Sequence, residues 1–556
     1  MAIMKRSQTK DVDLAVGPAL AALLPQNPKP WYRTRHLLLL NCILLIPWLS
    51  ATAYGFDGSM MNGLQSLPQW RNYFDKPSSS ILGTMNAVYP IGKFFGLFAT
   101  AWLGDRYGRK LPMYFGFALL VVGAALQGAA QDVAMFIVAR LLLGIGTAGV
   151  SQPAPILISE LAYPTHRGRL TAMYYSTYYV GGIIAAWSTY GTFRMQNTWS
   201  WRIPSLLQGA VPLFQLCLLY FVPESPRFLI SKGRTEEARR LFVKHHAGGD
   251  ESSPMVAFEI SEIQKAISHE KTIHSETSYL DLVRTKANRK RTLIAVIVGF
   301  YGTWAGVAVI AYYLTLVLDT IGITSASMQT LINAILNVVN FVVAVLSAAL
   351  VDRIGRRPLW IWGVIGMFVS YLVWTVLSAK FQETHRSAYG NAVLVFIFLY
   401  KVFYDGCYSP MLLAYPIEIF PYTLRSRGLS ASMATNQVAL IMAQFVNPIA
   451  LDAIGWKYYI VFCVLLLIFL ALIYFFFPET KGRTLEEIAG VFEQESAALG
   501  QDAVKEMQAE AELVEVVEPA PERRKGAATR TALRHSANGA DPQAGLRKEK
   551  GCIRFG

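Results

Sequence analysis

The stretch LGDRYGRKLPM at residues 103–113 decides the fold, because it returns as LVDRIGRRPLW at residues 350–360. Asp105 and Asp352 occupy the same place in the two copies and stand 247 residues apart. A motif that returns at such a distance indicates that the chain contains an internal repeat.

Two further pairs of motifs keep a similar spacing. SELAYPTHRGRL at 159–170 resembles IEIFPYTLRSRGLS at 417–430, and PESPRFL at 223–229 resembles PETKGRT at 478–484. Three matched pairs in the same order predict two related halves.

The composition is that of a membrane protein. Of the 556 residues, 53% are hydrophobic and 16% are charged, whereas soluble domains carry roughly 25% charged residues. Apolar blocks such as 461–477 recur along the chain. The net charge of +14 comes from Lys and Arg clustered between these blocks rather than on one soluble face, which argues against nucleic-acid binding.

Twelve windows are apolar and long enough to span a bilayer. They lie near 37–59, 81–103, 111–130, 133–157, 171–192, 203–222, 292–318, 328–350, 358–378, 391–414, 429–451 and 457–477. The loops on one side carry 23 Lys and Arg residues, against 7 on the other. The positive-inside rule therefore predicts that both termini are cytosolic. The predicted fold class is an all-α membrane protein with two pseudo-symmetric six-helix halves.

This topology divides the chain into five parts. We expect a cytosolic N-terminal segment (1–36), an N-terminal six-helix half (37–222) and a cytosolic linker with short amphipathic helices (223–291). A C-terminal six-helix half (292–477) and a cytosolic tail (478–556) follow. The tail begins with the helix-compatible TLEEIAGVFEQE and is predicted to be disordered after about residue 517. The spacing of the five cysteines predicts neither a disulfide nor a metal site.

The ordered set of motifs resembles the sugar porter family of the major facilitator superfamily, over about residues 35–490. The elements that carry the resemblance are Gly55-Phe56-Asp57, both DRxGR loops, Pro155–Glu160, PESPRFL and PETKGRT. The blocks IIAAWSTYGT, WSWRIPSLLQ and YYLTLVLDTIGIT further resemble fungal lactose-permease-like transporters. The resemblance implies sugar transport by alternating access, without a cofactor.

Two charges inside apolar spans are candidates for proton coupling. An aspartate at membrane depth costs several kcal/mol, so Asp57 needs either a partner or solvent at an outer boundary. Arg140 in the fourth span is a plausible partner, and the resemblance places both residues at the proton-coupling site. We expect a proton on Asp57 to loosen its pairing with Arg140 and so permit the change to the inward-open state.

The resemblance also implies a cytosolic latch of charged side chains that holds the outward-open state. Gly108 and Gly355 permit tight turns in the DRxGR loops. The alternative is that these charges only anchor the loops on the cytosolic side. The predicted members of the latch are Asp105, Arg106, Arg109, Glu160, Arg167, Asp352, Arg353, Arg356, Glu418 and Arg427.

Sugars are bound by amide and hydroxyl groups together with aromatic faces, so polar residues inside the spans are candidates for the substrate site. Asn333, Asn337 and Asn340 share one helix face, and Asn340 aligns with a sugar-contacting Asn of the family. Helix–helix contact is the alternative for this row. The predicted substrate-binding residues are Asn340, Asn337, Asn333, Thr303, Tyr312, Tyr313, Asn436, Gln437 and Tyr175.

The cavity departs from the family pattern. Thr303 stands in place of a usual Gln, Tyr175 in place of an amide, and Leu413 in place of a sugar-stacking Trp. A less polar solute, a glycoside, a disaccharide or a cyclic acid would suit such a cavity as well as glucose.

Three more charges lie inside spans. Lys401 and Asp405 are spaced i,i+4 and are expected to form a structural ion pair, whereas the role of Lys93 stays open. The GxGxxG at 144–149 follows no strand, so it indicates close helix packing rather than a nucleotide site.

The leading interpretation is a multi-pass transporter of the plasma membrane that couples a hexose or a disaccharide to protons and works as a monomer in the bilayer. The alternatives are transport of a polyol, a quinate-like acid or an exported secondary metabolite, and a nutrient sensor that does not transport. The sequence has no Walker A, HExxH or GxSxG motif, so neither ATP-driven transport nor an enzyme is supported.

Overall fold

The computed structural model describes residues 20, 23–24, 30–276, 278–421, 423–481 and 492, without the side chains of residues 169, 172, 269–276 and 348–353. All described residues belong to one compact unit. The predicted tail helix and the predicted disorder after residue 517 lie outside the described residues.

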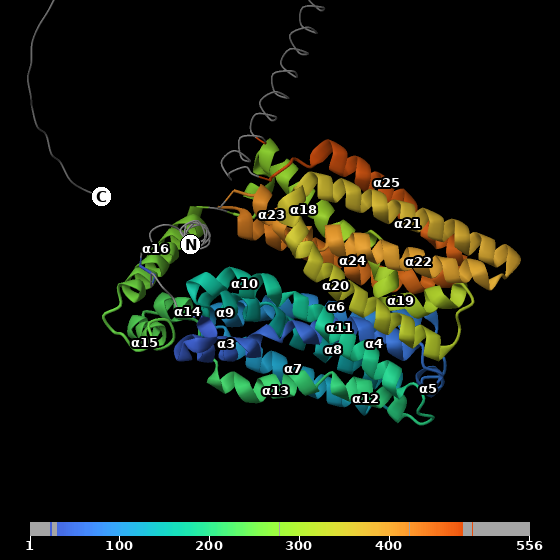
Figure 1. The fold of residues 1–556 in the computed structure, drawn as a ribbon, viewed down its shortest axis with the longest axis horizontal. Helices are drawn as coiled ribbons and strands as arrows, with labels where there is room; N and C mark the ends of the chain where they lie inside the picture. The colour runs from blue at the N-terminus through green and yellow to red at the C-terminus, as the bar shows by residue number, and fades with distance from the viewer. Residues whose placement is uncertain are drawn as a thin grey trace, which may run out of the picture. The chain divides into compact units, whose positions relative to one another are not determined.

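The described residues form helices joined by short connections, and no strand occurs among them. Figure 1 follows the first half from blue to green. Its elements are η1 (Trp31–Arg33), α3 (Arg35–Trp48), α4 (Ala51–Gln65), α5 (Pro68–Tyr73), α6 (Ser79–Tyr107), α7 (Lys110–Gly128), α8 (Val133–Ser151), α9 (Pro153–Leu161), α10 (Pro164–Tyr174), α11 (Ser176–Thr192), α12 (Trp199–Leu207), α13 (Ala210–Leu218) and η2 (Leu219–Phe221).

The linker and the second half follow. The linker contains α14 (Pro226–Ser231), α15 (Thr235–His245), α16 (Pro254–Glu276) and α17 (Asp281–Arg284). The second half contains α18 (Lys286–Trp304), α19 (Val307–Thr320), α20 (Ala326–Ile354), α21 (Arg356–Thr384), α22 (Ser387–Phe403), η3 (Tyr404–Tyr408), α23 (Met411–Ile419), α24 (Arg425–Ile454), η4 (Gly455–Lys457) and α25 (Tyr458–Phe476).

The helices account for the twelve predicted spans. Nine stretches of the described residues are long and apolar enough to cross a membrane, and the stretch Arg425–Phe476 contains two helices, α24 and α25. Two further predicted spans correspond to α6, which is less apolar, and to α11, which has only 17 residues. The predicted all-α membrane fold is confirmed.

The glycine motif at 144–149 packs helices together, as predicted. A Cβ atom on Gly144 would overlap the backbone carbonyl of Tyr89 in α6. A Cβ atom on Gly146 or on Gly149 would lie 2.8 Å from the backbone of Gly116 in α7. Small residues allow three helices of the first half to approach closely, which membrane packing requires because lipid offers no hydrophobic driving force.

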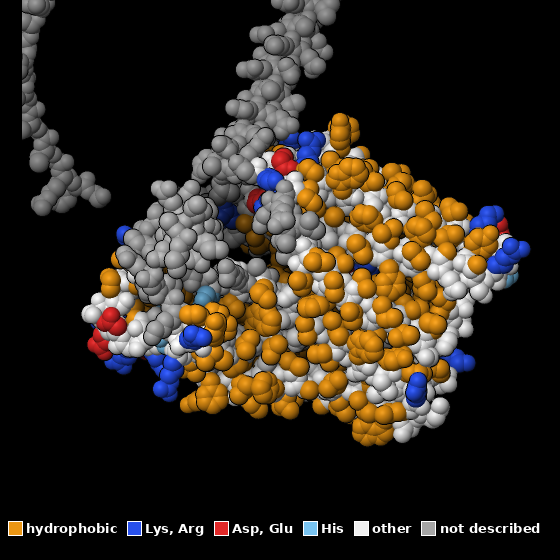
Figure 2. Space-filling view, viewed as in Figure 1, with side chains coloured by type: hydrophobic (Ala, Val, Ile, Leu, Met, Phe, Trp, Pro, Cys, Tyr) orange, Lys and Arg blue, Asp and Glu red, His pale blue; other side chains and the backbone are white. Residues whose placement is uncertain are grey.

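Helix pairs at which the two halves meet include α4 with α19, α4 with α20, α11 with α20, and α6 with α24. Apolar side chains cover the outer surface of the spans in Figure 2. Phe95, Trp362 and Phe475, for example, are each about two-thirds or more exposed. Such a surface fits acyl chains rather than water.

Candidate functional site

Asp57 and Arg140 form a buried ion pair inside the first half. Both side chains are fully buried, and the guanidinium contacts the carboxylate in a bidentate way, with distances of 3.0 Å and 3.1 Å. Gln208 donates a third hydrogen bond to Asp57, and Arg140 also donates to the carbonyl of Met85. Such a pair is stable away from water only because its remaining polar atoms are bonded.

Aromatic residues surround this pair where the halves meet. The ring of Tyr54 packs on that of Tyr178 with centroids 5.1 Å apart, and the ammonium of Lys93 lies 3.6 Å from the centre of the Tyr54 ring. Beside Asp57, Gly58 faces Tyr312 from the second half. Lys93 is thus satisfied by an aromatic face, a partner that sequence spacing does not reveal.

The seventh predicted span is broken near the level of this site. Gly306 separates α18 from α19 with a left-handed φ of +103°, and the Tyr371 hydroxyl donates to its carbonyl. Tyr313 departs from helical geometry and donates through its hydroxyl to the carbonyl of Gln444. A broken helix frees backbone groups that side chains of the opposite half can bind.

The asparagine row of α20 divides into two parts. Asn333 and Asn337 both donate to Ser59 of α4 in the first half, at 3.2 Å and 3.0 Å. In the amide orientation that satisfies both of its polar atoms, Asn340 instead donates to Asp405 at 3.0 Å. Two of the three predicted substrate ligands therefore hold the halves together, and the third belongs to another cluster.

That cluster is built on a π-helical segment, η3. Lys401 and Asp405 form the predicted ion pair at 3.0 Å, and both side chains are more than nine-tenths buried. The hydroxyl of Tyr179 in α11 donates to the same carboxylate at 3.2 Å. Asp405 thus connects the second half to the first.

The other predicted substrate residues lie on α18, on α24 and at the junction of α10 and α11. Asn436 donates to the carbonyl of Gly299 and to the hydroxyl of Thr303, which joins α24 to α18. Gln437 beside it is buried. Tyr175, at the junction of α10 and α11, is 52% exposed.

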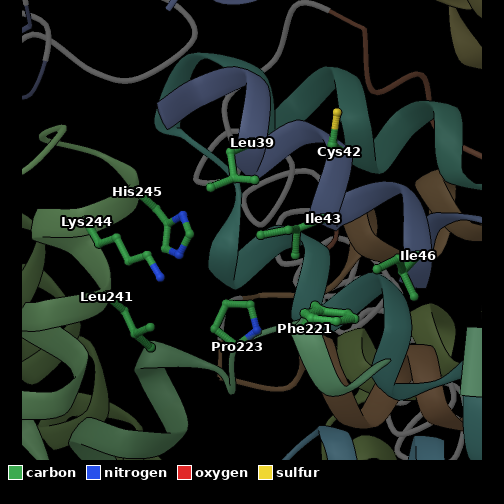
Figure 3. Close-up of a pocket in the computed structure, with 9 residues that line it drawn as sticks. All are labelled: Leu39, Cys42, Ile43, Ile46, Phe221, Pro223, Leu241, Lys244 and His245. Carbon is green, nitrogen blue, oxygen red and sulfur yellow. The ribbon is translucent and has the colours of Figure 1, made fainter. Parts of the chain in front are cut away.

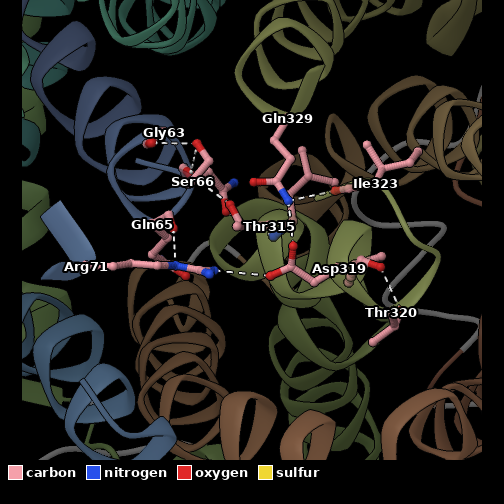
Figure 4. A network of polar contacts seen from close by, with 12 residues as sticks. Gly63, Gln65, Ser66, Arg71, Thr315, Asp319, Thr320, Ile323 and Gln329 are labelled. Carbon is pink, nitrogen blue, oxygen red and sulfur yellow. Dashed lines mark hydrogen bonds and ion pairs between the residues drawn. The ribbon is translucent and has the colours of Figure 1, made fainter. Parts of the chain in front are cut away.

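A polar network joins the halves at the end of the spans away from the linker (Figure 4). Arg71 of α5 binds the carbonyl of Gln65 and pairs with Asp319 at the end of α19, at 3.2 Å. Gln329 of α20 donates to the other oxygen of Asp319. Nearby, Asn62 of α4 donates to the carbonyls of Ile310 and Ala311 in the broken helix and accepts from the backbone N–H of Leu314.

On the linker side, the motif residues of the first half form one cluster. Arg109 pairs with Asp105 at 3.2 Å and lies 3.9 Å from Glu160. Glu224 of PESPRFL accepts from the backbone N–H groups of Arg109 and Lys110 at the start of α7. A carboxylate at this position satisfies N–H groups that have no partner within the helix.

The second half repeats this cluster. Arg356 pairs with Glu418 at 3.0 Å, and Glu479 of PETKGRT accepts from the backbone N–H groups of Arg356 and Arg357 at the start of α21. Ser225 binds Glu160 in the first half as Thr480 binds Glu418 in the second. Gly108 and Gly355 precede the two helices with φ values of +101° and +104°, as the predicted tight turns require.

The other predicted latch residues have different described contacts, where their side chains are described. Arg106 stacks on Trp102, and Arg427 is buried against the ring of Tyr279. Arg167 is exposed and forms no ion pair with another described residue. The side chains of Asp352 and Arg353 are outside the described part of the chain.

Replacing Glu479 by Gln is expected to lower stability by about 1 kcal/mol, because one oxygen that binds backbone N–H groups becomes an amide. Burial raises the pKa of Glu479, but hydrogen bonds from backbone N–H groups outweigh it and hold the pKa below its usual 4.5. This stabilisation is present above pH 4.5 and is lost as the pH falls through the lowered value. Thermal unfolding of the purified protein over pH 3.5 to 7 would measure it, with Glu251→Gln on an exposed turn as the control. Equal effects of both substitutions would contradict the capping role.

Several residues of these clusters escaped sequence reasoning. The recurrence of PESPRFL and PETKGRT was the signal for Glu224 and Glu479, whereas Ser59, Gln208 and Tyr179 carried no signal, since a neutral polar residue in a membrane helix is common.

Comparison with known proteins identifies the family. Residues 43–492 match the model of the sugar (and other) transporter family. The chain is 30% identical over 471 residues to a high-affinity glucose transporter of Kluyveromyces lactis, covering 82% of this chain and 85% of that protein. It is 29% identical over 457 residues to the MFS-type transporter criB of Aspergillus cristatus, covering 82% of this chain and 94% of that protein.

The fold agrees with a solved structure. The inward open conformation of the xylose transporter XylE from E. coli superposes with a TM-score of 0.68 at 23% identity, covering 81% of this chain and 99% of that one. The motif order, the twelve spans and the family match lead to one conclusion. The chain belongs to the sugar (and other) transporter family, the sugar porters of the major facilitator superfamily.

Proposed function

We propose that this sugar transporter is a proton symporter, with Asp57 as the proton carrier and Arg140 as its partner. The observation that carries the proposal is the fully buried, bidentate Asp57–Arg140 pair beside the surface where the halves meet. Protonation of Asp57 removes one charge of the pair and leaves hydrogen bonds that a neutral acid holds less strongly. The proton would thereby loosen the contact that ties α4 to α8.

Movement of the two halves relative to each other would open this site alternately to the two sides of the membrane. The outer network of Arg71, Asp319 and Asn62 bridges the ends of the spans away from the linker. Figure 2 shows a hollow between the halves on the linker side, near α10 and α23. We assign this arrangement to a state that is closed outside and open toward the cytosol. The two motif clusters would form the latch and rearrange when the hollow closes.

The solute we favour is a hexose or a disaccharide, which the glucose transporter of Kluyveromyces lactis supports. Asn340, Asn436 and Thr303 offer amide and hydroxyl groups to sugar hydroxyls, with Tyr312 as the aromatic face. The alternative is a non-sugar solute, because Thr303 and Leu413 replace polar or stacking groups of the family pattern. We place the protein in the plasma membrane, with cytosolic termini and a monomeric working form.

Uptake in yeast that lacks its own carriers tests this function. Labelled glucose, galactose, lactose, cellobiose and quinate would be supplied at pH 5 and pH 7.5. Accumulation of a sugar above its outside concentration at pH 5, and its collapse on adding a protonophore, is the expected result. Accumulation of quinate alone would favour the non-sugar alternative, and equal equilibration at both pH values would contradict proton coupling.

Replacing Asp319 by Asn is expected to open the outer end of the spans more often. The pair with Arg71 is partly exposed, so its loss should change the ratio of outward-open to inward-open protein by no more than about fivefold. A cysteine placed on the outer part of the cavity, labelled by a membrane-impermeant reagent, would report the change. Lys457→Ala is the control, because Lys457 is exposed at the same end of the spans, and it should leave labelling unchanged. A decrease in labelling of the Asp319 variant would contradict this role.

A further inference from the structure

A groove lies outside the transport site, between the first spanning helix and the linker. It has a volume of about 440 Å³, within the range of small-molecule sites. Figure 3 shows its walls, with one side formed by α3, the other by α15, and a floor at the end of η2. The lining residues are Leu39, Cys42, Ile43, Ile46, Phe221, Pro223, Leu241, Lys244 and His245.

The two parts of the groove differ in chemistry. The four residues from α3 follow the spacing i, i+3, i+4 and i+7, so they form one apolar stripe along about 10 Å of the helix. Leu39 and Phe221 are about half or more exposed, which places the stripe on the surface that contacts lipid. The opposite wall carries an ammonium and an imidazole, which Figure 3 shows pointing from α15 toward α3.

Within the described part of the chain, neither polar group has a hydrogen-bond or ion-pair partner. His245 is 5% exposed, and its Nδ1 atom is buried without a hydrogen bond. Burial, with nearby Lys244, lowers the pKa of His245 to about 4, so at neutral pH its imidazole is uncharged and has one N–H to donate. Among the described residues, no carboxylate pairs with the exposed Lys244. A cation and an unused donor at the end of an apolar stripe fit a phosphate group attached to an acyl chain.

We propose that this groove binds an anionic phospholipid from the leaflet on the linker side, which the distribution of Lys and Arg predicts to be cytosolic. One acyl chain lies along the α3 stripe, and the net negative headgroup, with its phosphate and a further anionic group such as the serine carboxylate, accepts hydrogen bonds from Lys244 and His245. Basic pockets beside spanning helices on the cytosolic side suit such headgroups, because that leaflet carries negative charge. The proposal needs only that the chain spans a membrane, so a failure of proton symport would leave it unaffected.

Lipid retention by the purified full-length protein tests the proposal. The protein in detergent would be exposed to equal amounts of phosphatidylserine and phosphatidylcholine, and native mass spectrometry would count the lipids retained. Retention of phosphatidylserine over phosphatidylcholine is expected, and Lys244→Gln should reduce this preference about fivefold. Lys232→Gln removes the same charge from the linker outside the groove and should leave the preference unchanged.

A second variant separates the groove from general surface attraction. Ile43→Trp fills the apolar stripe and keeps Lys244, and it should reduce retention of both lipids. A phosphatidylserine carrying a photoreactive acyl chain should label the peptide around Leu39–Ile46 in the unaltered protein and not in this variant. Equal retention of the two lipids, full displacement by inorganic phosphate, or labelling that survives Ile43→Trp would overturn the proposal. Unchanged unfolding temperatures would show that both variants fold.

Discussion

Asp57→Asn is expected to abolish accumulation of the solute against its gradient while leaving the protein folded. The amide keeps the size of the carboxylate and can still accept a hydrogen bond from Arg140, but it cannot carry a proton at any physiological pH. In the structure this carboxylate receives two bonds from Arg140 and one from Gln208, all inside a fully buried site. A neutral side chain there mimics the protonated state permanently.

The expected phenotype is therefore specific. The variant should still exchange labelled for unlabelled solute, because the halves can move when Asp57 is neutral, but the inside concentration should stop at the outside value at both pH 5 and pH 7.5. Asp75→Asn is the matched control, since Asp75 is exposed and has a left-handed φ of 54° that Asn adopts readily. Undiminished uphill uptake by Asp57→Asn would show that another group carries the proton.

The sequence was sufficient to predict those site residues whose charge is energetically costly inside an apolar span. A charge inside an apolar span needs an explanation, so Asp57, Arg140, Lys401 and Asp405 stood out, and the i,i+4 spacing was enough to predict the second pair. The repeat predicted the fold because two halves that share motifs in one order share a topology. These inferences need only the spacing of residues along the chain and the polarity of each residue.

The sequence could not predict which neutral polar residues make helix–helix contacts and which are available to bind the solute. Asn333 and Asn340 lie on the same helix face, yet one bonds to Ser59 across the halves and the other to Asp405. The choice depends on which element lies opposite each Asn, because α20 packs against α4 at one position and against η3 at the other. Tyr179 was missed for the same reason, because its partner is 226 residues away.

The buried pair Lys401–Asp405 should be among the strongest determinants of stability in the second half. Lys401→Met leaves the Asp405 carboxylate buried without its cation, a change that costs about 3–5 kcal/mol in comparable sites. The double variant Lys401→Met with Asp405→Leu removes both charges, and its stability should return to within about 1–2 kcal/mol of the original protein, since Tyr179 and Asn340 still lose their acceptor. Thermal unfolding of the purified proteins would measure both changes.

The exposed pair Lys380–Glu383 provides the matched control, because its side chains are more than half exposed and Lys380→Met should cost less than about 1 kcal/mol. Uptake then separates structure from function. If the pair only stabilises η3, the double variant should transport as well as the original protein. We expect it to transport poorly, because Asp405 is where Tyr179 of the first half and Asn340 of the second meet, and this contact must form and break as the halves move. A stable double variant with full uptake would show that the pair has a structural role and no role in transport.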